Sequence, residues 1–96
     1  IEQINLQVKE VALSMQDEIS LAVGASNGYR RDFKLPDKIG SRDYAIDIVD
    51  DLVYVKTDDE KFAIALPVGE VIGDPLKGDN FITKIGDKVY LNTLPS

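Results

Sequence analysis

Carboxylates are the side chains in this sequence whose type and spacing suit metal binding or acid–base catalysis, and they gather in three polar segments. The segments are Asp50-Asp51, Asp58-Asp59-Glu60, and Asp74 with Asp79 and Asn80. Oxygen ligands in turns suit Ca²⁺, and paired carboxylates can hydrolyse glycosides. None of the segments has EF-hand spacing, however, and Asp and Asn favour turns without any metal. At hairpin tips such carboxylates should be solvated with unshifted pKa values, so we predict neither a metal site nor a catalytic pair.

Other catalytic groups are scarce. The chain contains no His, Cys or Trp, and therefore lacks imidazole and thiolate ligands, a Cys nucleophile and the usual proton shuttle near neutral pH. Ser14, Ser20, Ser26 and Ser41 have no His to activate them, and no G-x-S-x-G turn occurs. The glycines of residues 69–73 lack the Lys-Ser/Thr of a phosphate-binding loop. We predict that the protein is not an enzyme and binds no cofactor.

Size and net charge limit the remaining classes of function. A chain of 96 residues with 44% hydrophobic and 29% charged side chains fits one compact domain. The formal charge is −6, from 17 acids and 11 bases, which disfavours nucleic-acid binding because phosphate recognition needs clustered Lys and Arg. No run of about 20 apolar residues occurs, so any membrane segment is expected to precede Ile1.

Charge is unevenly distributed along the chain. Residues 30–42 contain five bases and two acids, whereas residues 43–61 contain seven acids and two bases. Neighbouring patches of opposite sign could register contacts between subunits. Alternatively, these are solvated charges of turns and edge strands that prevent sheet-to-sheet aggregation.

The first part of the chain is predicted to be one long helix. It carries an extensive apolar surface rather than candidate catalytic groups. Its apolar residues recur at spacings of three and four, which is typical of one stripe on a helix, and Gly24 supplies a stop. At about 1.5 Å per residue this helix is roughly 35 Å long. The stripe consists of Ile1, Ile4, Val8, Val11, Met15, Ile19 and Ala22.

Two further leucines of this helix lie nearly opposite the stripe. With about 100° of turn per residue, Leu6 and Leu13 cannot face the same sheet as Ile4 and Val11. They are either scattered exposed leucines of the kind common on soluble helices, or a second packing surface for neighbouring subunits.

After residue 26 the hydrophobic period falls from about 3.6 to 2, which predicts strands. Asp50-Asp51 and Gly86-Asp87 are expected to form tight hairpin turns, and residues 57–61 a longer polar turn. The expected extended segments are residues 33–35, 44–48, 52–56, 62–68, 81–85 and 88–91, with a short piece at 71–72.

These elements predict an α+β fold in which one long N-terminal helix packs on a five- to six-stranded antiparallel sheet. The helix, residues 1–26, and the sheet head, residues 27–96, are expected to form a single domain. We further expect the N-terminal turns of so long a helix to overhang the sheet, which leaves Ile1 and Ile4 without an intramolecular partner.

The arrangement is similar to the type IV pilin superfamily, and within it the sequence resembles archaeal pilin-like proteins with class III signal peptides. Two passages carry this resemblance. The first is GYRRDFKLP at residues 28–36 followed by YAIDI at residues 44–48, and the second is GDNFITK at residues 78–84 followed by GDKVYLN at residues 86–92. The signal peptide, its processing site and the strongly apolar first half of a pilin helix are absent from the sequence.

The resemblance implies a non-enzymatic structural subunit of an archaeal surface filament, located at the cell surface or outside the cell. Subunits would be anchored in the membrane by a segment upstream of Ile1 and would bundle their helices with copies of themselves or with other pilin-like subunits. The candidate assembly contacts are Ile1, Ile4, Leu6, Val8 and Leu13. The alternative is a membrane-tethered adhesin or accessory binding domain of a surface appendage, whose sheet head recognises a ligand.

Overall fold

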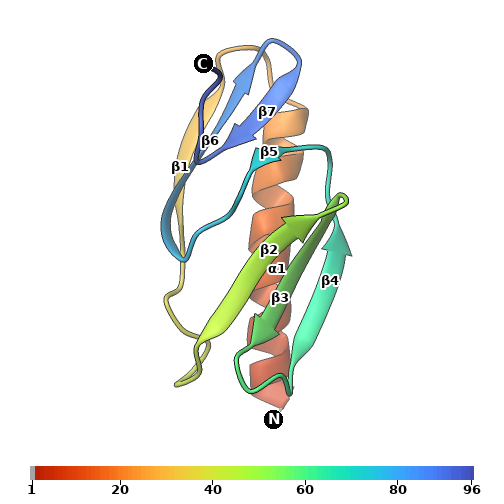
Figure 1. The fold of residues 1–96 in the computed structure, drawn as a ribbon, viewed down its shortest axis with the longest axis vertical. Coiled ribbons are helices and arrows are strands. Elements are labelled where there is room, and N and C mark those ends of the chain that lie inside the picture. Colours follow the sequence, from red (N-terminus) through yellow and green to blue (C-terminus); the bar gives the residue numbers. More distant parts are fainter. Residues whose placement is uncertain (1) are drawn as a thin grey trace.

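A computed structural model describes residues 2–96 as one helix followed by seven strands (Figure 1). The predicted α+β class and the N-terminal helix packed on antiparallel strands are confirmed. The strand count was too low, because there are seven strands in two sheets rather than five or six in one. The elements are α1 (Glu2–Val23), β1 (Arg30–Leu35), β2 (Tyr44–Val49), β3 (Leu52–Thr57), β4 (Ala63–Pro67), β5 (Ile72–Gly73), β6 (Gly78–Ile85) and β7 (Lys88–Leu91).

The two sheets lie one beyond the other along the helix (Figure 1). The four-stranded sheet, of order β1-β6-β7-β5, lies beside the C-terminal half of α1, and the three-stranded sheet, β2-β3-β4, lies beside its N-terminal half. A helix of 22 residues is about 33 Å long, whereas a six-residue strand is only about 20 Å long. Two sheets placed end to end can therefore cover a helix that one sheet could not.

The expected overhang of the N-terminal turns is consequently wrong for the described residues. Val8 is only 2% exposed, Val11 is also buried, and Ile4 packs half-buried against the same core. The core continues along the helix through Met15 and Ile19, both fully buried. A single apolar stripe on α1 thus runs under both sheets.

The predicted hairpin turns are confirmed. Asp50 and Asp51 both adopt positive φ, 51° and 61°, as the two-residue turn of the β2–β3 hairpin requires, and Asp tolerates this region better than most residues. Gly86, with φ of 65°, opens the two-residue β6–β7 turn. These turns set the register that directs Tyr44 and Ile46 of β2 toward the core.

The C-terminal end of α1 is held by a lysine from a distant strand. Lys84 of β6 donates from Nζ to the carbonyl oxygens of Val23 (2.7 Å) and Ala25 (3.2 Å). The last turn of the helix carries no basic residue, so Lys84 supplies the cation that the negative end of the helix dipole favours. Farther back, Arg31 of β1 pairs with Glu18 at 2.9 Å.

Asn80 organises the loop between β5 and β6. Its side chain is only 4% exposed and every polar position on it is used. Nδ2 donates to the carbonyl oxygens of Leu76 (2.7 Å) and Gly78 (3.0 Å), while Oδ1 accepts from the Leu76 N–H (2.9 Å) and from Asn92 Nδ2 (2.8 Å). The second passage of the resemblance therefore contains a residue with a clear structural role.

Asn92 continues this network across the end of β7. Its Oδ1 accepts from the Phe81 N–H at 2.9 Å, and its Nδ2 also donates to the Asp74 carbonyl at 2.8 Å. Gly73, in the short parallel strand β5, comes so close that an added Cβ would lie 2.0 Å from the Leu91 carbonyl oxygen. Side-chain amides and one glycine thus fix the path of residues 73–80.

Tyr44 anchors the connection from β1 to β2. Its ring is buried and its hydroxyl donates to the Pro36 carbonyl oxygen. Burial, with a smaller contribution from the negative charge of Asp37, raises the pKa of Tyr44 to about 12. The phenol therefore stays protonated at any physiological pH and acts as a structural donor.

Candidate assembly surfaces

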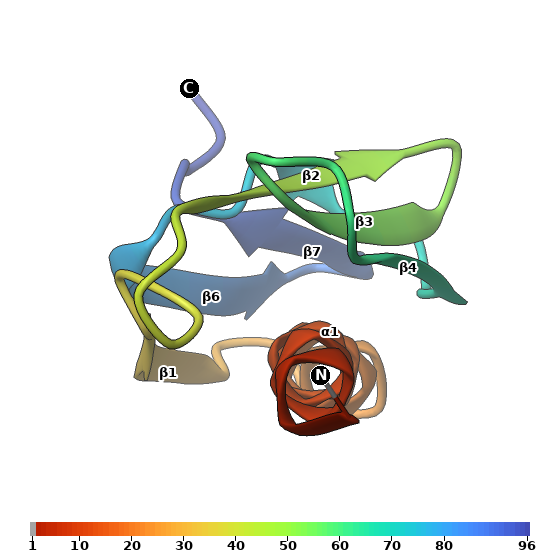
Figure 2. The ribbon, with the colours of Figure 1, turned by 90° about the horizontal axis from the view of Figure 1, so that it is seen from below.

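The side of α1 that faces away from both sheets carries leucines, as the sequence predicted. Leu6 is 58% exposed and Leu13 is half-buried, and Leu21, farther along the helix, is 55% exposed. Figure 2 looks along the helix: β2, β3, β4, β6 and β7 lie above it, β1 lies beside it, and no strand lies below it. Leu21 lies off to one side, about 60° around the helix from Leu6, so we call Leu6 and Leu13 the leucine side of α1.

The other predicted contact residues of the helix lie elsewhere. Val8 belongs to the core of the single chain, and Ile4 packs against that core, with its Cδ1 3.2 Å from the position of the Cβ that Gly40 lacks. Ile1 lies outside the described residues. Among the predicted contacts within residues 2–96, Leu6 and Leu13 are therefore the ones that lie opposite the core stripe of α1.

A second apolar surface was not predicted. Strand alternation directs nine residues of β2, β3 and β4 away from α1, and seven of them are apolar. Sheets with one solvated face normally alternate apolar and polar residues, so this composition is unusual. We call these residues the outer sheet face: Ala45, Asp47, Val49, Leu52, Tyr54, Lys56, Ala63, Ala65 and Pro67.

The outer sheet face is hollowed at its centre. Ala45 of β2 and Ala63 of β4 lie on either side of Lys56, and Ala65 lies beside Tyr54, so that an open depression of about 530 Å³ extends over these residues. Tyr54 and Val49 are 42% and 52% exposed. The signal that could have revealed this surface is the alanines, which occupy positions where a solvent-facing strand usually has polar residues.

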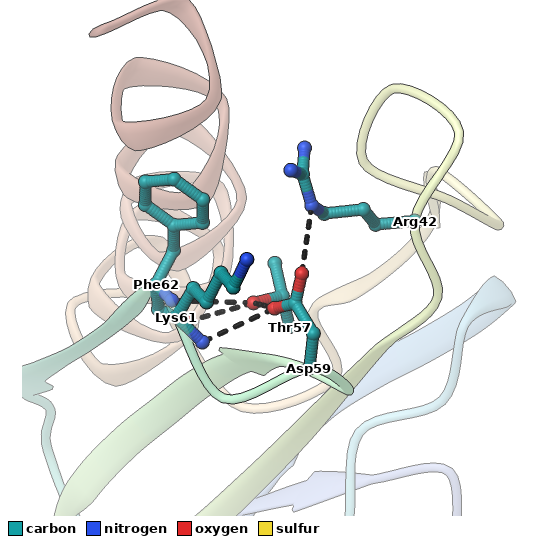
Figure 3. A network of polar contacts seen from close by, with 5 residues as sticks. All are labelled: Arg42, Thr57, Asp59, Lys61 and Phe62. Carbon is teal, nitrogen blue, oxygen red and sulfur yellow. Dashed lines mark hydrogen bonds and ion pairs between the residues drawn. The ribbon is translucent and has the colours of Figure 1, made fainter. Parts of the chain in front are cut away.

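The acidic turn at residues 58–62 is held by a network of polar contacts (Figure 3). Asp59 Oδ1 accepts from Thr57 Oγ1 (2.7 Å) and from the Lys61 N–H (3.1 Å), and Asp59 Oδ2 pairs with Arg42 Nε at 3.0 Å. These contacts, led by the Thr57 hydrogen bond, lower the pKa of Asp59 to about 2. The expectation of unshifted carboxyl pKa values at hairpin tips is therefore wrong for Asp59. A carboxylate held ionised in this way is unsuited to donate a proton near neutral pH.

The remaining acidic segments do not converge on one point. Asp50 and Asp51 form a turn, Asp79 pairs with Lys34 at 3.6 Å, and Asn80 is fully engaged in its own network. Within residues 2–96 no group of three acidic side chains is placed to hold a metal ion.

The basic segment at residues 30–42 is paired within the chain. Each of its five bases lies within 3.6 Å of a carboxylate of the same molecule. This pairing favours the interpretation of solvated local ion pairs over a basic patch reserved for another subunit. The bases are Arg30, Arg31, Lys34, Lys38 and Arg42.

Comparison with protein-family models, curated proteins and solved structures finds no match to this chain. No helix within residues 2–96 is long and apolar enough to cross a membrane.

Proposed function

We propose that the protein is a non-enzymatic structural subunit of an archaeal type IV pilus-like filament at the cell surface, and that it assembles through α1. The observation that carries the proposal is the leucine side of the helix, which lies opposite the core stripe of α1 and on which Leu6 is 58% exposed. The resemblance of residues 28–48 and 78–92 to archaeal pilin-like proteins gives the class of assembly.

The strength of the helix contact indicates how such a subunit must work. Because Leu6 is 58% exposed and Leu13 is already half-buried, burying what remains of both contributes roughly 1–3 kcal/mol, given about 1.5–3 kcal/mol for a fully exposed leucine. Free association of two proteins costs an estimated 4–15 kcal/mol in lost motion, so these leucines alone do not hold two untethered copies together. An upstream membrane anchor would raise the effective concentration and make the same contact productive.

The proposal is tested by electron microscopy of cells that produce the full-length protein. Replacing Leu6 and Leu13 together with Gln should abolish filaments or shorten them while leaving the folded head intact. A matched control is Leu94→Gln, because Leu94 is exposed to a similar extent, 53%, but lies at the other end of the chain. Filaments of unchanged number and length in the helix variant would contradict the proposal.

The second candidate is a membrane-tethered adhesin or accessory domain that binds a ligand through its head. The observation in its favour is the apolar outer sheet face, since large exposed apolar patches mark interaction sites. Under this hypothesis Tyr54→Ser abolishes surface attachment, whereas the Leu6 and Leu13 variant does not.

A further inference from the structure

We propose that the free edge of β4 binds an extended segment of another polypeptide, in which basic residues precede an alternating apolar strand. β4 is an edge strand of the three-stranded sheet, and no strand lies beyond it in Figure 1. A segment added at such an edge gains main-chain hydrogen bonds, while its side chains decide which segment binds. This binding is separate from filament assembly, because it uses the edge of a sheet rather than the leucine side of α1.

The main-chain groups of Ala63 and Ala65 point away from β3. Just before β4, the Phe62 carbonyl oxygen accepts from the Thr57 N–H at 2.9 Å, so Phe62 faces β3. Neighbouring residues of a strand direct their main-chain groups alternately to the two sides, so those of Ala63 and Ala65 face outward. Within residues 2–96 these outward groups have no hydrogen-bond partner.

Pro67 marks the end of the free edge. Its carbonyl oxygen also faces outward, where it accepts from Gln16 Nε2 at 2.8 Å, as the alternation requires. Proline has no N–H to offer an added strand. The free edge of β4 therefore consists of the N–H and C=O groups of Ala63 and Ala65.

β4 lacks the protection that the other edges have. β1, at the edge of the four-stranded sheet, has four charged residues among six, and charged edge strands discourage pairing. β5 has only two residues. β2 carries Asp47, and Lys77 from the loop after β5 lies 5.5 Å from the ring of Tyr44 at its start. None of the five residues of β4 is charged.

The row of β4 side chains that faces the core is only partly covered. Ile64 and Leu66 are half-buried, whereas their partners in β3, Val55 and Val53, are fully buried. A strand added beside β4 would set its own inward side chains against Ile64 and Leu66. The bound segment should therefore have apolar residues at alternate positions.

The C-terminal end of β4 calls for a basic partner. Three exposed carboxylates lie at or just beyond it and take part in no ion pair among residues 2–96: Asp50, Asp51 and Glu70. At the other end, acids of the turn already have bases beside them, in the pairs Arg42–Asp59 and Lys56–Glu60. An antiparallel segment has its N-terminal end beside the C-terminal end of β4, so its basic residues should come first. The net charge of −6 disfavours a second copy of this chain as the occupant.

Hydrogen exchange of single amides, measured by NMR, tests the site with the synthetic peptide KRVTITVS. In the free protein the Ala63 and Ala65 amides should exchange fast, whereas the Ile64 amide, which is bonded to β3, should exchange slowly. Excess peptide should protect Ala63 and Ala65 and change Ile64 little. The matched peptide EEVTITVS should bind about tenfold more weakly, because it sets like charges together.

Variants of the protein provide a second measurement. Glu70→Lys should weaken binding of KRVTITVS and strengthen binding of EEVTITVS. Asp87→Lys makes the same change of net charge at the exposed β6–β7 turn and should affect both peptides little. Ala65→Pro removes a free N–H without touching the hydrogen bonds to β3, and should abolish the protection of Ala63. If this proline variant does not fold, the peptide and Glu70 comparisons still decide the question.

Three results would overturn the inference. The first is fast exchange of Ala63 and Ala65 in excess KRVTITVS, and the second is equal affinity for the two peptides. The third is protection that appears without peptide and rises with protein concentration, which would show that a second copy occupies the edge. None of these results bears on the proposed function, which the filament assay of the Leu6 and Leu13 variant decides.

Discussion

Replacing Asn80 with Ala is expected to destabilise the fold by about 3 kcal/mol, although the residue lies far from both proposed surfaces. The side chain makes four hydrogen bonds and is almost fully buried. At a net 0.5–1.5 kcal/mol each, four bonds sum to roughly 2–6 kcal/mol. Leu76 is exposed, so its backbone groups regain water in the variant, which favours the lower half of this range.

The assay is urea denaturation followed by circular dichroism. The free energies of unfolding are compared with one common m-value, which is the slope of the free energy of unfolding against urea concentration. Asn5→Ala is the matched control, because Asn5 lies exposed on α1 and its replacement should change stability by no more than about 0.5 kcal/mol. Asn80→Asp keeps the size of the side chain but loses both donated bonds, so it should be at least as destabilised as Asn80→Ala. If Asn80→Ala is as stable as the Asn5 control, the structural role assigned to the amide network is refuted.

Two further predictions concern the C-terminal end of α1 and the acidic turn. Lys84→Met should lower the free energy of unfolding by about 1–2 kcal/mol, because it removes the cation and two hydrogen bonds at the C-terminal end of α1. Thermal unfolding measures this loss, and the control Lys88→Met, at an exposed lysine, should show none. Because the pKa of Asp59 is about 2 when folded and about 3.9 in unfolded chains, its stabilisation is present above pH 4 and is lost as the pH falls through 2. Asp59→Asn should therefore remove part of the stability loss between pH 4 and 2 in a urea series, and a pH profile parallel to that of the native chain would contradict the network in Figure 3.

The helix and the two tight hairpins could be predicted because their signals are local. The apolar stripe and Gly24 define α1, and Asp50-Asp51 and Gly86-Asp87 have the residue types that two-residue turns need. The division into two sheets is different, because β1 pairs with β6 across more than forty intervening residues and β5 pairs with β7 in parallel. Nothing local in the sequence specifies those pairings, and the amides that support them, Asn80 and Asn92, read as ordinary turn residues.

Of the two candidate surfaces, one could likewise be predicted from local sequence signals and the other could not. Leu6 and Leu13 could be placed opposite the core from helical geometry alone, and in the structure Leu6 is exposed and Leu13 is half-buried. Val8 was also predicted as an assembly contact, but it is buried in the core of the single chain, because the second sheet lies beside the N-terminal half of α1. The outer sheet face needed the actual strand register, because an alanine in a strand does not reveal which face it occupies or what lies beside it.

If the protein assembles as proposed, the leucine side of α1 becomes buried between subunits. The most direct measurement is the rate at which a maleimide labels Leu6→Cys in assembled filaments and in dispersed subunits, with Leu94→Cys as the control. Our account predicts that assembly slows labelling strongly at position 6 and little at position 94. Equal labelling of position 6 in both states would contradict it.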